Sequence, residues 1–245
     1  MKYFLDTEFI EGLHKPMFGK KRHFIDLISI GIVSEDGAEY QAISKEYDYA
    51  TASDWVKKNV ILPLYRAQSP TIKQFTNPHT FHKAVGKSNA KIANEIIAFI
   101  NPHMNTDSGG YFETLILDDG YGVAHGIKSF SPDDNCPYFI WRNQPEFFGY
   151  YADYDWVLLC SLFGTMMQLP KGFPMYCRDL KQMVDGKVLS FMRNVDSAKG
   201  TKDQISFDKQ LEIFKKLPGY PKQANEHGAI DDARWNRDLY KFLTA

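Results

Sequence analysis

KYFLDTEFI, residues 2–10, is the stretch that decides the predicted fold. Aromatic and aliphatic side chains dominate it, which favours a β-strand, and Gly12 follows as a strand breaker. A second apolar run, FIDLISIGIV at 24–33, is followed by turn residues at 35–37 and by a segment at 39–43 that can form a third strand. The chain is therefore predicted to begin with a three-stranded antiparallel meander.

The rest of the chain alternates helical and extended patterns. Helices are predicted where apolar residues recur at spacings of three and four, and short apolar runs between them predict further strands. The predicted elements are a helix at 53–62 with Ser53 as N-cap and Pro63 as stop, a helix at 79–100, a strand at 146–152, a helix at about 154–168, a strand-to-helix step at 175–184, a polar stretch at 192–206 and a final helix at 228–243. This order predicts an α/β fold with a mixed central sheet flanked by helices.

Residues 101–137 differ from their surroundings. Asn, Asp, Gly, Ser and Pro are crowded there around one short apolar patch at 111–117. Such a composition predicts a hairpin with loops that is inserted into the fold, and not a separate domain. We therefore expect a single domain over residues 1–245, because this length suffices for one sizeable core.

The composition excludes several classes of protein. With a formal net charge of −1, the chain lacks the basic character of a transcription factor or histone-like protein. No apolar run reaches the roughly 18–20 residues of a membrane span, and the early acidic residues leave no hydrophobic region for a signal peptide. The widely spaced cysteines, Cys136, Cys160 and Cys177, contain no CxxC pattern, which argues against a disulfide framework and a structural zinc. A cytoplasmic protein without a membrane partner is predicted.

Asp6 and Glu8 lie inside the first apolar strand. Side chains at positions i and i+2 of a strand point to the same face, so the two carboxylates are expected side by side. Like charges repel there unless a cation neutralises them, and Mg²⁺ prefers oxygen ligands of this kind. The alternative is an edge strand whose acidic residues face water.

Asp155 is expected where a helix follows an apolar strand. An Asp at this place is also common as a helix cap or as a partner of the helix dipole. Asp153 is the competing candidate, two residues earlier. The residues alone leave the choice between the two open.

His227 precedes a helix that carries Asp232 in its first turns. The small residues Gly228 and Ala229 leave the backbone beside the histidine open to a ligand. A histidine close to a carboxylate can accept a proton from a metal-bound water. An exposed histidine with ordinary helix N-terminal acids is the alternative, and Asp231 is an ambiguous neighbour.

The three signals together indicate phosphoryl transfer with two metal ions. This chemistry needs several carboxylates from separate elements, since one cation lowers the pKa of the attacking water and the other stabilises the leaving oxygen. We expect two Mg²⁺ ions, which Mn²⁺ can replace, bound by Asp6, Glu8, Asp155 and Asp232. His227 is expected to act as the general base.

These five residues resemble the DEDDh branch of the DnaQ-like 3′–5′ exonucleases, a superfamily with the ribonuclease-H-like fold. Its motifs are Asp-x-Glu on the first strand, an Asp at a helix start and His-x₄-Asp, and the resemblance spans nearly the whole chain. The segments FLDTEFIEG, SDWVKKNVILPL, YYADYDWVLLCSLFG and PMYCRDL are similar to small bacterial and phage exoribonucleases of mycobacterial type. Where many relatives carry His-Asn before the middle Asp, this chain has Tyr151 and Ala152. The resemblance favours Asp155 over Asp153 as that Asp, because the residues after it match the helix of the family: Trp156, Leu158, Leu159 and Leu162.

The resemblance implies that the chain shortens single-stranded RNA from its 3′ end to 5′-mononucleotides. A preference for DNA, or a non-catalytic nucleic-acid-binding module, are the alternatives, and a homodimer is one assembly that the sequence allows. Phe9 and Tyr151 are candidates for stacking on the terminal base, with core packing as the alternative. Thr7 is a third candidate substrate contact. The basic segment KPMFGKKRH at 15–23 can contact phosphates or form a solvated loop.

Overall fold

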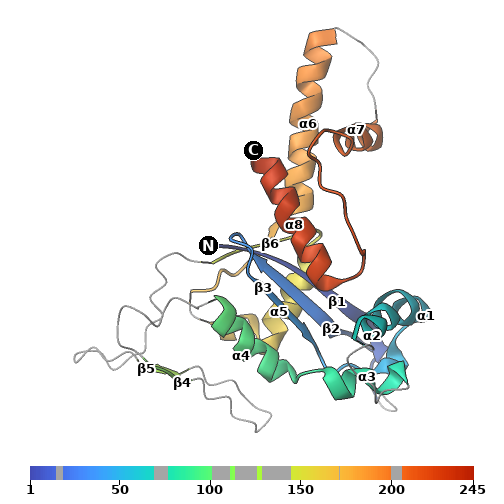
Figure 1. Cartoon of the computed structure of the whole chain (residues 1–245), viewed down its shortest axis with the longest axis vertical. Helices are drawn as coiled ribbons and strands as arrows, with labels where there is room; N and C mark the ends of the chain where they lie inside the picture. The colour runs from blue at the N-terminus through green and yellow to red at the C-terminus, as the bar shows by residue number, and fades with distance from the viewer. Residues whose placement is uncertain are drawn as a thin grey trace.

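The computed structural model describes residues 1–14, 19–68, 77–100, 111–113, 126–128, 145–170, 172–199 and 206–245. Its central sheet has five strands in the order β3-β2-β1-β6-β7 (Figure 1). The strands are β1 (Lys2–His14), β2 (Arg22–Ser34), β3 (Glu39–Ile43), β6 (Glu146–Gly149) and β7 (Arg178–Asp179). The first three are antiparallel neighbours, whereas β6 is parallel to β1 and β7 is parallel to β6. This mixed sheet flanked by helices is the ribonuclease-H-like fold that the sequence predicts.

The predicted meander is confirmed, but β1 and β2 are longer than predicted. Gly12 does not end β1; it pairs with Phe24 inside the sheet. A Cβ at residue 12 would lie 2.8 Å from the Phe24 ring, so the ring fills the space that a side chain would need. At Gly31 of β2, a Cβ would lie 2.4 Å from the carbonyl oxygen of Ala229. The backbone of α8 (Ala229–Thr244) therefore rests directly on β2.

Alternation along β1 separates the two faces of the sheet. Tyr3 and Leu5 pack against α4 (Asn89–Ile100) and α5 (Asp153–Leu162) on one face. Phe4 packs on the other face with α8 and with α6 (Leu180–Lys199) and α7 (Phe207–Phe214), two helices that extend away from the sheet in Figure 1. By the same alternation, Asp6 is directed to the α8 side of the sheet.

A third cluster forms where Ile10 and Ile28 meet a group of short helices. These helices are η1 (Tyr49–Thr51), α1 (Asp54–Val56), η2 (Lys57–Ile61), α2 (Leu62–Gln68) and α3 (Pro78–Val85). Ser53 caps α1 as predicted, because its Oγ accepts the Val56 N–H at 3.2 Å. The prediction that Pro63 ends the helix is wrong, since Pro63 lies inside α2 directly after the π-helical η2. The wider π turn gives the proline ring room that an α turn would deny it.

Three other predicted boundaries are corrected by the structure. The helix predicted at 79–100 is two helices, because Gly86 is extended and a Cβ there would lie 2.3 Å from the carbonyl oxygen of His82. The helix predicted to reach residue 168 ends at Leu162 and is followed by η3 (Met166–Gln168). α6 runs to Lys199 through part of the predicted polar stretch, since polar residues without Gly or Pro are compatible with a helix.

Within the predicted insertion at 101–137, the structure describes β4 (Tyr111–Glu113) and β5 (Gly126–Lys128), which pair antiparallel as a hairpin requires. The other residues of the insertion, including Cys136, lie outside the described residues. Among the helices that the structure does describe, none combines the length and the apolar character needed to cross a membrane.

Candidate active site

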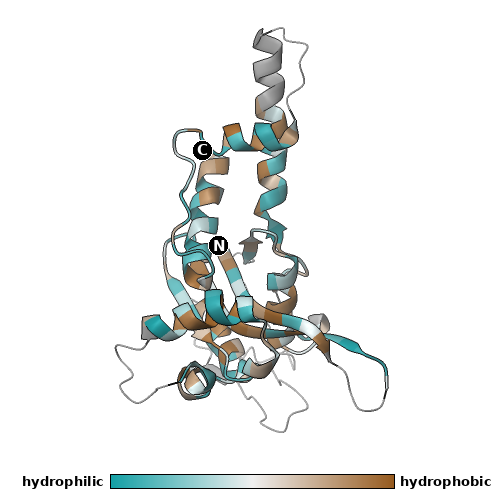
Figure 2. Cartoon of the chain, turned by 90° about the vertical axis from the view of Figure 1, so that its right-hand side faces the viewer, coloured by the Kyte–Doolittle hydropathy of each residue, from teal (hydrophilic) through white to brown (hydrophobic). Residues whose placement is uncertain are grey.

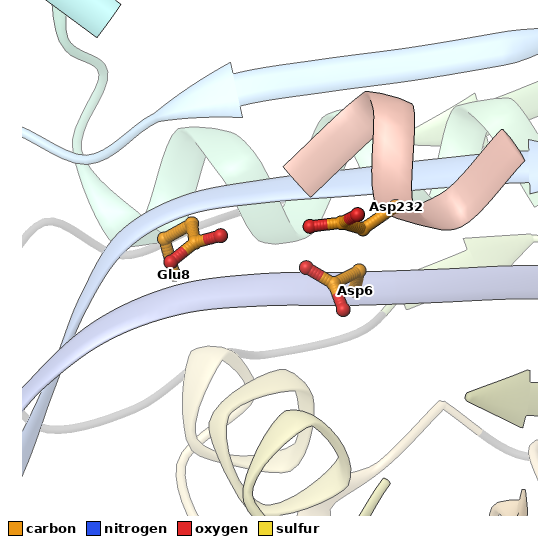
Figure 3. A group of neighbouring side chains, drawn as sticks. All are labelled: Asp6, Glu8 and Asp232. Carbon is orange, nitrogen blue, oxygen red and sulfur yellow. The ribbon is translucent and has the colours of Figure 1, made fainter. Parts of the chain in front are cut away.

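Asp6 and Glu8 of β1 face Asp232 of α8 (Figure 3). The two β1 residues share a face of the strand, and Asp232 lies in the first turn of the helix that covers this face. α8 is fixed there by Asn236, whose Nδ2 donates to the Leu5 carbonyl oxygen at 2.9 Å. One carboxylate oxygen from each of the three residues lies within 4.8 Å of the other two. Such a group can hold a metal ion, because hard divalent cations prefer oxygen ligands.

The free edge of β1 brings in a fourth carboxylate. β6 pairs with β1 only as far as Phe4, so the peptide groups beyond this residue can bond to side chains. Thr7 donates twice to Oδ1 of Asp155, from its backbone N–H at 2.9 Å and from its hydroxyl at 2.6 Å. Asp155 is 6% exposed, whereas Asp153 is exposed in the same turn of α5. The structure thus brings Asp155 to β1 and leaves Asp153 in solvent.

Burial raises the pKa values of all four carboxyl groups, and repulsion from other members of the cluster raises those of Asp6, Glu8 and Asp155 further. Burial is the largest cause, and it raises the pKa of Glu8 to about 8 and that of Asp155 to about 6. The pKa of Asp6 is raised well above its ordinary value, first by burial and then by repulsion from Asp155, Glu8 and Asp232. The pKa of Asp232 is raised as well. Without positive charge the cluster therefore retains protons near neutral pH, which fits a site built around cations.

The loop that carries His227 is held against the start of α8 by polar contacts. Gln223 Nε2 donates to Oδ1 of Asp232 at 2.6 Å, and the His227 backbone N–H donates to Oδ2 at 3.0 Å. Asn225 Nδ2 donates to Asp231 at 3.3 Å. Asn225 and His227 have φ values of 53° and 69°, left-handed conformations that persist only where surrounding contacts hold them. The loop therefore orients both oxygens of Asp232.

Asp231 is the neighbour of Asp232 whose role the sequence leaves ambiguous. In the structure it anchors this loop from outside the carboxylate cluster. Arg234 Nη1 donates to Asp231 at 2.5 Å, and Arg234 Nε donates to Glu39 of β3 at 2.7 Å. These contacts run from Glu39 of β3 through Arg234 and Asp231 to Asn225, and they support the loop from β3.

The chain has clear relatives among known proteins, although no protein-family model matches it. Two 3′–5′ exoribonucleases, from two strains of Mycobacterium tuberculosis, are each 30% identical to it over 183 residues. The aligned region covers 75% of this chain and 73% of each relative. The chain belongs to this 3′–5′ exoribonuclease family.

In this member of the exoribonuclease family, Trp55 and Gln223 reach the site although the sequence analysis does not predict them. The Trp55 ring lies edge-on to the His227 imidazole, with ring centroids 4.9 Å apart and planes at 80°. Trp55 is 55% exposed on α1. In the sequence, Trp55 is only an aromatic residue near the start of a predicted helix. Nothing in the polar segment around Gln223 distinguishes that residue from its neighbours.

The predicted substrate contacts have different surroundings in the structure. Phe9 is partly buried, with its ring centroid 5.4 Å from that of the exposed Tyr154. Tyr151 is 63% exposed between β6 and α5, and its φ of 56° is a strained value of the kind found at functional sites. Thr7 is buried, and its hydroxyl is occupied by Asp155. Of the basic segment, residues 20–23 are exposed, and residues 15–18 lie outside the described residues.

Proposed function

We propose that this chain is a metal-dependent 3′–5′ exoribonuclease that hydrolyses single-stranded RNA from the 3′ end and releases 5′-mononucleotides. The observation that carries the proposal is the convergence of Asp6, Glu8 and Asp232, with Asp155 fixed beside them by Thr7. The names of the mycobacterial relatives favour RNA over DNA as the substrate.

We assign Asp6, Glu8, Asp155 and Asp232 as the ligands of two Mg²⁺ ions, which Mn²⁺ can replace. A donor set made only of carboxylate oxygens suits these hard cations. The raised pKa values support the assignment, because nearby positive charge would stabilise the ionised carboxylates. When bound, the two ions lower the pKa of the attacking water and stabilise the charge on the leaving oxygen.

His227 is assigned as the general base. Its imidazole takes a proton from the water that attacks the terminal phosphodiester. The 3′ oxygen of the preceding nucleotide leaves and is protonated by solvent, so the products are a 5′-mononucleotide and an RNA shortened by one residue. The backbone bond to Asp232 and the edge contact with Trp55 support this role, since they restrict where the imidazole can lie.

Phe9 and Tyr151 are assigned to stacking on the bases near the 3′ end. Stacking on an aromatic ring is worth about 1–3 kcal/mol per base and tolerates any sequence. The ring of Tyr154 lies next to Phe9 and extends the aromatic surface beside Asp155. Thr7 is assigned to orienting Asp155 through its hydroxyl.

A time course with 5′-labelled RNA and DNA of matched sequence tests the function. The proposal predicts an RNA ladder that shortens from the 3′ end with Mg²⁺ or Mn²⁺, slower shortening of DNA, and no reaction in EDTA. Asp6→Asn should abolish the ladder, whereas Glu11→Gln, a matched change of an exposed carboxylate on the same strand, should not. Faster shortening of DNA would mean that the enzyme prefers DNA to RNA. Absence of cleavage of both RNA and DNA would favour a non-catalytic nucleic-acid-binding module.

A homodimer and a cytoplasmic location stay predictions. Light scattering on the purified full chain measures the first, and fractionation of the cells that express it measures the second.

A further inference from the structure

The outer parts of β1 and β2 form a two-stranded ribbon that leaves the central sheet. β3 pairs with β2 only over Ser29–Val33, and β6 pairs with β1 only over Lys2–Phe4. Residues 9–14 of β1 and 22–27 of β2 pair with one another alone in the described sheet. Figure 2 shows this ribbon projecting from the body of the molecule, with a hydrophilic outer end. The ribbon is anchored at its inner end by Ile10, which is buried against the helices α1 to α3.

Positive charge is concentrated at the outer end of the ribbon. Lys20, Lys21 and Arg22, here called the basic tip, are all exposed. No ion pair joins the basic tip to any other residue that the structure describes. The acidic residues of the ribbon are the exposed Glu11 and the half-buried Asp26, which lie three and four residues from Arg22 in the strand register. Among the described residues, the basic tip is therefore positive charge without an ion-pair partner, on a chain whose formal net charge is −1.

The same strand carries the carboxylate cluster and leads to the basic tip. From Glu8 to His14, which pairs with Arg22, β1 advances six residues, a distance of about 20 Å at roughly 3.3 Å per residue. An enzyme that holds the 3′ end of RNA at the cluster must let the upstream chain leave the site. Phe9, which packs beside the cluster of Tyr3 and Leu5, and the exposed Leu13 lie along this stretch of β1. An RNA strand that follows the ribbon would pass these apolar side chains before its phosphates reach the basic tip.

We propose that the basic tip binds the phosphates of single-stranded RNA several nucleotides upstream of the 3′ end. This inference rests on the proposed function for the direction in which the RNA lies. Phosphate contacts from Lys and Arg give affinity without sequence preference and depend strongly on salt. The tip therefore makes the protein prefer long RNA to RNA too short to span from the cluster to the tip.

The test is the binding of labelled RNA to the full chain in EDTA, where no cleavage occurs. Fluorescence anisotropy compares RNA of about 4 and about 16 nucleotides, at salt concentrations from low to physiological. Wild type is compared with the triple variant Lys20→Gln, Lys21→Gln, Arg22→Gln. A control triple variant, Lys209→Gln, Lys215→Gln, Lys216→Gln, removes the same charge from exposed positions on and after α7.

Wild type and the control variant should bind the longer RNA more tightly than the shorter one, and the tip variant should lose this difference. The slope of log affinity for the longer RNA against log salt should fall by about 2, since each of three contacts contributes about 0.7 on single strands. Equal binding of both lengths by wild type, wild-type binding by the tip variant, or equal losses in both variants would overturn the proposal.

Cleavage by wild type in Mg²⁺ is scored separately from this binding. Absence of cleavage would count against the proposed function and leave the binding result standing. Cleavage with no length effect on binding would remove the role of the tip alone.

Discussion

Replacing Glu8 by Gln is expected to stabilise the metal-free protein, and to do so increasingly as the pH rises. In the folded protein, burial and repulsion from Asp232 and Asp155 raise the pKa of Glu8 from 4.5 to about 8. The folded protein then keeps a proton that the unfolded chain releases, so the free energy of unfolding falls as the pH rises from about 4.5 to about 8. One pKa unit corresponds to about 1.4 kcal/mol, and the loss between pH 4.5 and pH 7 is therefore about 3 kcal/mol.

Glu8→Gln keeps the shape of the side chain and removes this loss. In EDTA at pH 7 the variant should gain about 3 kcal/mol, which corresponds to roughly 6–12 °C in melting temperature for a chain of this size. At pH 5 the gain should fall to about 1 kcal/mol, because half a pH unit above 4.5 leaves only part of the unfolded chain's proton release. Calorimetry at both pH values measures the effect, with the exposed Glu11→Gln as a control that should not change. A gain of equal size at pH 5, or no gain at pH 7, would contradict the raised pKa of Glu8 in the folded protein.

Thr7→Val removes the hydrogen bond from the Thr7 hydroxyl to Asp155. Because a hydrogen bond to a charged group is worth about 1.5–3 kcal/mol, we expect kcat with Mg²⁺ to fall about tenfold or more. An unchanged kcat would contradict the role of Thr7 in positioning Asp155. His227→Gln should lower kcat by about 10²–10⁴ without moving the Mg²⁺ concentration for half-maximal activity, and a large shift of that concentration would make His227 a ligand instead. Gly31→Ala should lower the free energy of unfolding in urea by about 2 kcal/mol or more, because its Cβ would lie 2.4 Å from the Ala229 carbonyl oxygen; wild-type stability would mean that α8 does not rest on β2.

Local patterns in the sequence predict most of the sheet and of its covering helices. The meander follows from apolar runs separated by turn residues, and β3 begins and ends at the predicted residues. The errors arise where a contact from elsewhere in the chain, or a backbone geometry that the sequence pattern does not indicate, overrides local preference. Gly12 stays in β1 because the Phe24 ring occupies its side-chain space, and Gly86 divides a predicted helix because the backbone around it is extended. Pro63 stays helical because a π turn precedes it.

The candidate site is predictable to the extent that it depends on local geometry. The period of two along β1 places Asp6 and Glu8 on one face, and the structure has them there beside Asp232. The choice between Asp155 and Asp153 depends on which one meets Thr7 at the free edge of β1, and that edge exists because β6 pairs no further than Phe4. No pattern in the local sequence predicts that β1 has a free edge beyond Phe4.

The contacts of Trp55 and Gln223 could not be predicted for a related reason. Both residues meet partners that are distant in the sequence or lie across an irregular loop. The loop adopts left-handed conformations at Asn225 and His227, and neither residue is a glycine that would have indicated them. Aromatic and amide side chains carry no periodic signal when they lie at a helix end or in a loop, so their roles emerge only from the packed structure.

Anomalous diffraction from crystals of the full chain grown with Mn²⁺ tests the assignment of the carboxylates most directly. We predict two manganese peaks among Asp6, Glu8, Asp155 and Asp232 in the wild-type protein, and the loss of at least one of them in Asp6→Asn. Crystals that show no peak at these carboxylates, or peaks only elsewhere on the protein, would contradict the assignment of this cluster as the catalytic metal site.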